Sequence, residues 1–332
     1  MKHRLITIIA IIILIITAVI CSKKSTQDYY KLDITSNVRQ VTKSVDLVDI
    51  NTDHNQVLDV VEYMKANKIK VPSTLINFDT HSDILLNAKV LSIKESSVAT
   101  WINNALAKYP EINEVYWVMP TELATDIGLQ GLFASNDLNY LDTPQTFFGN
   151  STNAKISFFH FVSNPLTKKA YEQELLIDPA TGMINENTTD DELIKKLFGK
   201  DKSKLRKVKL ITCTEKTLPD LKDKDILLSI DADYTSNSGF DTVDDFRFIK
   251  NSAGINATFY SIFETLKNKN AQPRIITLSL SPQYLPERHH EFVNEIFGHI
   301  LYVANKTDKI EKYKNKYNSP EYFMEEYKKA GI

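Results

Sequence analysis

Two short acidic motifs contain the residues whose types and spacing could do chemistry. The first has Asp79, His81 and Asp83, and the second has Asp231 and Asp233. Side chains two residues apart on an extended chain point to the same side, so the acids and the imidazole of a motif can face one point. Each of these residues alone could be a strand-end cap or a turn residue. Four carboxylates gathered together would repel one another and would be costly to bury without positive charge. The two motifs together therefore predict a metal site.

The donor atoms favour particular metals. Carboxylate oxygens and imidazole nitrogens without any thiolate favour Mn²⁺, and Fe²⁺, Zn²⁺ or Co²⁺ are also possible. Two such ions about 3.5–4 Å apart suit bridging carboxylates and lower the pKa of a bridging water. We therefore expect two divalent metal ions and a metal-bridging hydroxide that attacks a carbonyl or amidine carbon of a small-molecule substrate.

Apolar runs lead into both motifs and indicate the elements that position them. The runs 74–79 and 225–231 are typical of buried strands. The carboxyl ends of parallel strands form the ligand crevice of α/β proteins, so the two motifs can meet at one sheet edge. Further strands are expected at 114–119, 207–212, 274–280 and 299–303, and helices at 55–67, 97–108, 190–198, 252–267 and 290–297. This alternation predicts a three-layer α/β/α fold with a mostly parallel sheet.

Residues 130–185 interrupt the alternation of strands and helices. Within them, 155–162 alternates weakly between apolar and polar residues and could pair with 171–177. We interpret this part as an inserted antiparallel hairpin or lid. The domain organisation that we expect is a polar tether over 25–43 followed by one α/β domain over 44–332 that contains the insertion.

Residues 1–24 read as a targeting or anchoring segment. A short basic start precedes an isoleucine-rich run without charge, Leu5 to Cys21, which as a helix would span roughly 25 Å. Three interpretations remain open: a signal anchor, a cleaved signal peptide, or a lipoprotein signal with lipidation at Cys21. Ile20 departs from the small residue that normally precedes a lipidated cysteine. We expect a protein held at the membrane by this segment, with its body outside the cytoplasm.

Composition excludes some classes of partner and of bond. The chain has 332 residues with a formal net charge of −2, and without a basic excess we expect no nucleic-acid partner. Nothing in the sequence indicates an oligomeric state. The chain has two cysteines, and with Cys21 in the N-terminal segment no disulfide is expected in the domain. Cys213 follows an apolar run and is expected to be a buried strand residue rather than a nucleophile.

The acidic motifs resemble those of a known family. The pattern Asp-x-His-x-Asp, followed about 150 residues later by Ser-x-Asp-x-Asp, resembles the signature of the ureohydrolases, which include arginase and agmatinase. The wider phrasing resembles an uncharacterised branch of the arginase-like fold, the UPF0489 family. The segments that carry this second resemblance are Asp53–Asn55, Asn77–Asp83, Ser97–Trp101 and Tyr116–Pro120.

This resemblance implies an arginase-like fold and a further metal ligand, His54. One metal would then be bound by His54, Asp79, Asp83 and Asp231. The other would be bound by Asp79, His81, Asp231 and Asp233, so that Asp79 and Asp231 are shared. Asp53 would be a partner behind the ligands.

The chain departs from the family in its substrate half. Arginase-like enzymes have a proton-shuttle histidine soon after the first motif, but this chain has no histidine between His81 and His160. The glutamate that holds guanidinium in the family is matched here by a stretch containing Ser279 and Ser281. We therefore expect neither arginase nor agmatinase activity in the strict sense.

Other residues are candidates for the substrate half. Tyr284 could stabilise an oxyanion, as the catalytic tyrosine of histone-deacetylase-like relatives does. His160 could reach the metals from a lid, although a packed histidine is the simpler interpretation. Ser281, Gln283 and His289 are expected near the substrate, with a helix-start surface role as the alternative for His289.

The sequence thus predicts a binuclear metal-dependent hydrolase of a C–N bond, in an amide, an amidine or a related group. Two alternatives remain: a catalytically inactive metal-binding module of the same fold, and a phosphoesterase.

Overall fold

The computed structural model describes residues 34–86, 89–92, 98–122, 169–238 and 248–305. Its central element is an eight-stranded sheet with the order β1-β8-β7-β2-β3-β6-β4-β5. The strands are β1 (Leu47–Asn51), β2 (Thr74–Phe78), β3 (Glu114–Val118), β4 (Tyr171–Ile177), β5 (Ile184–Glu186), β6 (Arg206–Cys213), β7 (Ile226–Asp231) and β8 (Pro273–Ser279). In this order, each strand from β1 across the sheet to β6 is parallel to its neighbours. The last two strands differ, because β4 is antiparallel to β6 and β5 is antiparallel to β4.

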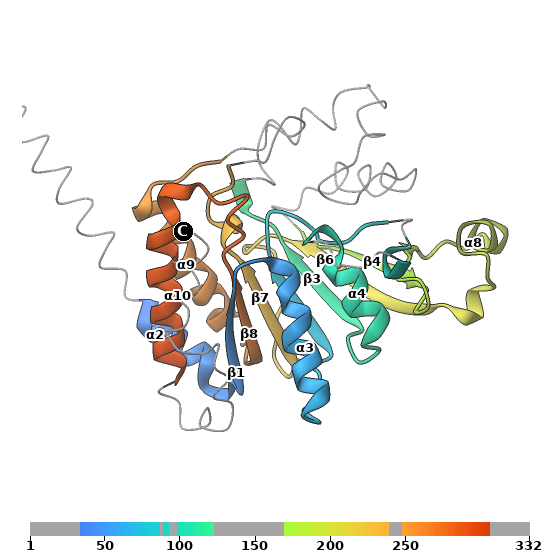
Figure 1. Ribbon diagram of the computed structural model, residues 1–332, viewed down its shortest axis with the longest axis horizontal. Coiled ribbons are helices and arrows are strands. Elements are labelled where there is room, and N and C mark those ends of the chain that lie inside the picture. The colour runs from blue at the N-terminus through green and yellow to red at the C-terminus, as the bar shows by residue number, and fades with distance from the viewer. Residues whose placement is uncertain (1–33, 87–88, 93–97, 123–168, 239–247, 306–332) are drawn as a thin grey trace, which may run out of the picture.

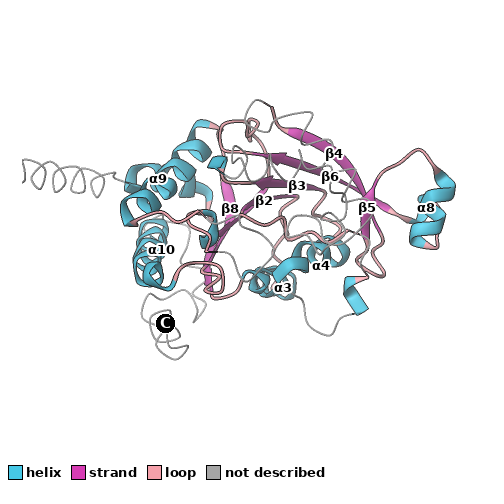
Figure 2. Cartoon of the chain, turned by 90° about the horizontal axis from the view of Figure 1, so that it is seen from above, coloured by secondary structure: helices cyan, strands magenta, loops and turns pink. Residues whose placement is uncertain are grey.

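Helices cover both faces of the sheet, as Figures 1 and 2 show. The helices are α2 (Ile34–Val41), α3 (Val57–Ala66), α4 (Trp101–Lys108), α8 (Asp191–Phe198), α9 (Ser252–Asn268) and α10 (His290–Asn305). One buried apolar cluster joins the sheet to α2, α9 and α10, and a second joins it to α3 and α4. Along β2, Leu75 faces the second cluster while Ile76 and Phe78 face the first. The predicted three-layer α/β/α fold is confirmed.

Most of the predicted strands are confirmed with small shifts at their ends. The exception is 299–303, where the prediction of a strand is wrong because these residues belong to α10. Val293, Phe297, Ile300 and Leu301 are buried and follow one another at helical spacing. A short apolar run does not by itself distinguish a strand from a buried helix. The strand β1 was not predicted.

Part of the expected insertion lies within the described residues. Tyr171–Ile177 is a strand as predicted, and among these residues it pairs with β6 and β5. Asp178 and Gly182 form the turn between β4 and β5, where Gly182 has a φ of 69° that favours glycine. Residues 155–162 lie outside the described residues.

The folded body begins earlier than the expected boundary at residue 44. Part of the segment interpreted as a tether forms α2, whose residues Ile34, Val38 and Val41 are buried against α9 and α10. The apolar spacing of these residues matches one face of a helix. Residues 1–24, including Cys21, lie outside the described residues. None of the helices in the described ranges has the length and apolar character needed to cross a membrane.

Cys213 is fully buried at the end of β6, as expected. Burial raises the pKa of its thiol well above the ordinary value. The thiol therefore stays protonated, which agrees with a packing role.

Candidate metal centre

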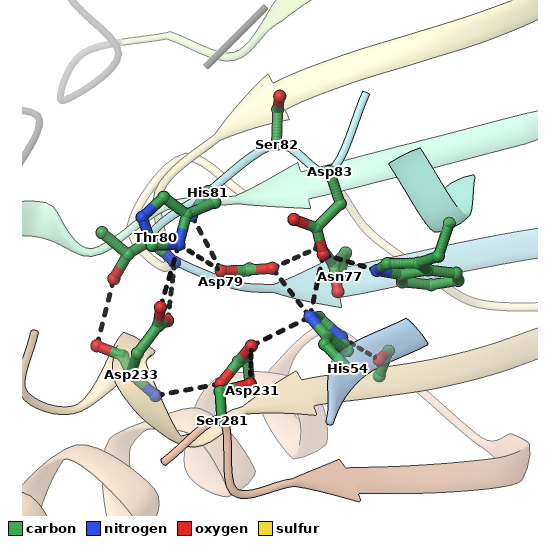
Figure 3. Close-up of polar contacts among 12 residues, drawn as sticks. His54, Asn77, Asp79, Thr80, His81, Ser82, Asp83, Asp231, Asp233 and Ser281 are labelled. Atoms are coloured by element: carbon green, nitrogen blue, oxygen red, sulfur yellow. Dashed lines mark hydrogen bonds and ion pairs between the residues drawn. The ribbon is translucent and has the colours of Figure 1, made fainter. Parts of the chain in front are cut away.

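The two acidic motifs meet at the carboxyl ends of β2 and β7. These strands are parallel neighbours, and Phe78 is paired with Ile230, so Asp79 and Asp231 follow at the same edge of the sheet. Figure 3 shows their side chains turned toward each other and toward His54. The parallel topology therefore brings together residues that are 152 positions apart (231 − 79) in the sequence.

The first group of ligands surrounds His54, which opens the short helix η2 (His54–Gln56). Its Nδ1 atom lies 3.0 Å from Asp79 Oδ2, 2.9 Å from Asp83 Oδ2 and 3.0 Å from Asp231 Oδ2. Three carboxylate oxygens thus converge on one ring nitrogen. A protonated ring nitrogen donates its one hydrogen to one acceptor at a time. Three oxygens around one nitrogen are therefore the arrangement expected of ligands that surround a shared cation.

The second group contains His81, whose Nδ1 atom lies 2.9 Å from Asp233 Oδ2 and 3.6 Å from Asp79 Oδ1. Asp79 therefore contacts both histidines, one with each carboxylate oxygen. Two sets of donor atoms could each hold a metal ion: His54, Asp79 and Asp231, and then Asp79, His81 and Asp233. Asp79 is common to the two sets. Asp231 belongs only to the first, whereas the family resemblance implied that both metals share it.

The same local geometry orients both motifs. Asp79 Oδ1 accepts a hydrogen bond of 2.8 Å from the backbone N–H of His81. Asp231 Oδ1 accepts one of 3.1 Å from the backbone N–H of Asp233. Each bond closes a turn directly after a strand, so one oxygen fixes the turn while the other faces the histidine cluster. Asp83 has a φ of 52°, which bends the chain back toward the site.

Residues behind the ligands hold them in place. His54 Nε2 lies 2.8 Å from Ser229 Oγ, and Ser281 Oγ donates to Asp231 Oδ2 at 2.6 Å. Trp101 Nε1 donates to Asp83 Oδ2. Such partners fix the orientation of a ligand and, for a histidine, its tautomer.

The expected partner Asp53 has a weaker connection to the site. Its side chain is half-buried, and burial together with the charge of Asp231 raises its pKa. No hydrogen bond joins it to His54 in the described residues, where Ser229 takes that position. Ser229 is the serine of the Ser-x-Asp-x-Asp pattern, so the motif itself carried the signal for it.

The site concentrates negative charge out of contact with water. Its four aspartates are between 0% and 5% exposed. Among the described residues, no lysine or arginine lies within 4.0 Å of their carboxylates, and the two histidines are their only ion-pair partners. Four buried carboxylates against two imidazoles leave an excess of negative charge.

The pKa values reflect this imbalance. Burial alone would lower the pKa of His54, but the charges of Asp231 and Asp83 raise it well above the ordinary value. Asp233 acts in the same way on the pKa of His81. Burial tends to raise the pKa of Asp79, but hydrogen bonds to the two histidines lower it.

The pKa values of Asp83 and Asp233 shift in the opposite direction. The pKa of Asp83 is raised well above its ordinary value by burial and by the charge of Asp79. The pKa of Asp233 is raised to about 7 by burial and by the charges of Asp231 and Asp79. Bound protons thus neutralise negative charge that bound divalent cations would otherwise neutralise. The donor set, the burial and the charge imbalance together fit two metal ions.

A small cavity of about 70 Å³ opens onto the ligands. Its described lining contains Ser281 and Tyr284, both predicted near the substrate, and Tyr284 places its ring 4.8 Å from that of His81. Apolar residues form the remaining wall: Ile84, Leu85, Val98 and Ala99. Sequence reasoning missed these residues because an apolar side chain near a motif does not by itself indicate that it lines a cavity.

Of the other three predicted site residues, two lie away from this cavity. Gln283 is exposed and is absent from the described lining of the cavity. His289 is buried at the start of α10, where its Nε2 accepts a hydrogen bond of 3.3 Å from Arg288 Nε, and it is absent from that lining as well. His160 lies outside the described residues.

Fold and site together define a three-layer α/β/α protein with two adjoining groups of residues that could each hold a metal ion. The chain matches no family model, and no curated protein is significantly similar to it.

Proposed function

We propose that this protein is a metal-dependent hydrolase that cleaves a C–N bond in a small molecule, related to the ureohydrolases through the UPF0489 branch. The observation that carries the proposal is the position of Asp79, which is shared by two His/Asp groups beside a cavity. Two bound divalent cations, Mn²⁺ being favoured by the oxygen-rich donor set, would polarise a carbonyl group and lower the pKa of a water molecule.

The side chains around the ligands have separate tasks in this proposal. Ser229 holds His54 Nε2 and leaves Nδ1 directed at the carboxylates. Tyr284 lies beside His81, and burial raises the pKa of its hydroxyl, which therefore stays protonated. A protonated hydroxyl can donate a hydrogen bond to the negative charge that develops on a substrate oxygen.

The cavity wall favours an uncharged reacting group. Its described lining has no carboxylate other than those of the metal ligands, so a guanidinium would have no separate counter-charge. The apolar side chains of Ile84, Leu85 and Val98 suit a small acyl group and exclude water from it. An amide therefore fits the cavity better than arginine or agmatine does.

Metal analysis combined with a substrate panel tests the proposal. The purified chain is loaded with Mn²⁺, assayed by elemental analysis, and offered small amides and guanidino compounds. We expect about two metals per chain, hydrolysis of amides, and loss of turnover in His81→Ala. A protein that binds no metal and hydrolyses nothing would refute the proposal.

One observation favours a second candidate, a metal-binding module without catalysis. Apart from the metal ligands, the only titratable side chain in the described lining of the cavity is Tyr284, so no separate base is present there. This candidate predicts metal-dependent thermal stability without turnover. Any turnover that depends on His81 excludes it.

We also propose that residues 1–24 attach the protein to a membrane, with its body outside the cytoplasm. The support is the uncharged run from Leu5 to Cys21 after a basic start. Membrane fractionation of the full chain, compared with a chain that begins at residue 25, tests this attachment.

A further inference from the structure

A second and larger cavity lies beside α9, away from the metal ligands. Its volume is about 670 Å³, against about 70 Å³ at the metal centre, and the described linings of the two cavities share no residue. Pockets for small molecules typically measure about 300–1,000 Å³. The chain around this cavity comes from α9, from the two residues before it, and from the segments that follow β3 and β6.

Glu215 lines this cavity and forms no close ion pair, although the charge of Lys250 acts on it from farther away and tends to lower its pKa. Its Oε1 accepts a hydrogen bond of 2.8 Å from Tyr234, and its Oε2 accepts one from Ser261. Among the described residues, no basic side chain lies within 4.0 Å of the carboxylate. Burial raises the pKa of Glu215, since the ionised form is poorly solvated. An ammonium group entering the cavity would supply the missing positive charge.

Lys250 provides the opposite charge on the same wall. Its Nζ atom donates to Thr258 Oγ1 at 2.8 Å and pairs with Glu122 Oε1 at 2.7 Å. The Glu122 side chain is 52% exposed whereas that of Lys250 is 19% exposed, so the carboxylate end of this ion pair is the end that is open to solvent. A ligand carboxylate could therefore replace Glu122, helped by the positive end of α9 and by the exposed Lys216.

The distance between the charges of Glu215 and Lys250 limits the length of the ligand. Thr258 holds Lys250, and Ser261 holds Glu215; the two hydroxyl residues are three positions apart on α9. Side chains at this spacing are neighbours, about 5–6 Å apart at Cβ. Ala253 and Ala257 also line the cavity, and because their side chains are small they leave room for a ligand on this surface of α9.

We propose that this cavity is a binding site for a small zwitterion, with its ammonium group at Glu215 and its carboxylate at Lys250. The two charges of the ligand are separated by a few methylene groups, which lie over the alanines of α9. This site does not rest on the proposed hydrolase activity, because the described linings of the two cavities share no residue.

Isothermal titration calorimetry on the full chain tests the site, with 4-aminobutyrate as the probe and butylamine and butyrate as single-charge analogues. We expect 4-aminobutyrate to bind at least about tenfold more tightly than either analogue, because only the zwitterion meets both charges. Glu215→Gln keeps one oxygen acceptor, for the hydroxyl of Tyr234 or of Ser261, and removes the charge, so it should weaken binding by about tenfold or more.

Two further variants make the result specific. Glu264→Gln is the matched control, because Glu264 lies on the same helix and also accepts a tyrosine hydroxyl, but does not line the cavity. It should bind 4-aminobutyrate like the wild type. Ala257→Leu fills the cavity without changing any charge and should abolish binding. The proposal is overturned if the wild type binds no 4-aminobutyrate, if butylamine or butyrate binds equally well, or if Glu215→Gln or Ala257→Leu leaves affinity unchanged.

Discussion

Buried carboxylates at the metal centre and on β1 are stabilised in different ways. At the metal centre, Asp79 is fully buried, and its pKa is lowered because His54 and His81 bind its ionised form. On β1, Asp49 is 7% exposed, and its Oδ1 has no hydrogen-bond partner. Burial and the charge of Asp59 raise the pKa of Asp49 to about 7.

The difference shows what a partner does for a buried acid. An isolated carboxylate avoids the cost of burial by taking up a proton, whereas a clustered one stays ionised only if positive charge is built around it. Asp49 is therefore interpreted as a core residue that is buried in its protonated form. Asp79 is interpreted as an ionised residue that can bind a cation. Changing the partners in either region tests this contrast.

The largest expected effect comes from removing a histidine from the cluster. His54→Ala leaves oxygens of Asp79, Asp83 and Asp231 facing one another without their common partner. We expect a loss of about 3–5 kcal/mol in the free energy of unfolding of the metal-free protein, as for a broken buried ion pair. Urea unfolding measures it. His299→Ala is the control, since His299 is exposed and contacts only Thr35 in the described residues; an equal loss there would contradict the account.

Adding metal should restore the balance of charge at the centre. Mn²⁺ at 100 times its Kd should stabilise the fold by about 2.7 kcal/mol, measured as a shift of thermal unfolding relative to EDTA. Because the pKa values of His54 and His81 are raised, both bind protons that a metal must displace, so Mn²⁺ affinity should fall as the pH is lowered. An affinity that is constant between pH 6 and pH 8 would argue against these ligands.

A smaller effect is expected behind the ligands. Ser229→Ala removes the hydroxyl that lies 2.8 Å from His54 Nε2 and leaves every ligand in place. Changes of this kind typically weaken metal affinity by about 10–100-fold. Competition with a metal indicator dye measures the change. If Asp53→Asn had the larger effect, Asp53 rather than Ser229 would be the partner that orients His54.

The smallest effect should come from the isolated acid. The folded-state pKa of Asp49 is raised above its ordinary value, so its protonated form favours the fold. Its contribution is fully present below about pH 4 and is lost as the pH rises toward 7. Asp49→Asn should therefore gain stability over the wild type as the pH rises from 5 to 8, on the order of 1–2 kcal/mol in urea unfolding. The exposed Asp191→Asn should show no such trend, and a trend of the opposite sign for Asp49→Asn would contradict the assignment.

The residues of the metal centre could be predicted from the sequence more completely than the elements around them. Asp79 and Asp231 could be paired in advance because each directly follows an apolar run, and parallel strands end at one edge. The strand β1 was missed because Asp49 and Asn51 interrupt its apolar pattern. The helix predicted at 290–297 was ended too early, because Ile300 continues the helical spacing of Val293 and Phe297, and the following run was therefore misread as a strand.

Contacts made in three dimensions left no signal in the sequence. Leu85 and Val98 line the cavity at the metal centre, but nothing in the segment around either residue indicates that its side chain faces the ligands. The cavity beside α9 joins Glu215 to Lys250 across 35 positions (250 − 215), with neither residue in a recognisable motif. Such residues are brought together by the packing of α9 on the sheet, which no local pattern encodes.

Metal stoichiometry in variants of the shared ligand tests the central claim most directly. Elemental analysis after loading with Mn²⁺ should give about two metals per chain for the wild type and about one for His54→Ala or His81→Ala. Asp79→Asn should give close to none, because Asp79 belongs to both groups. Two bound metals in Asp79→Asn, or none in the wild type, would contradict the account.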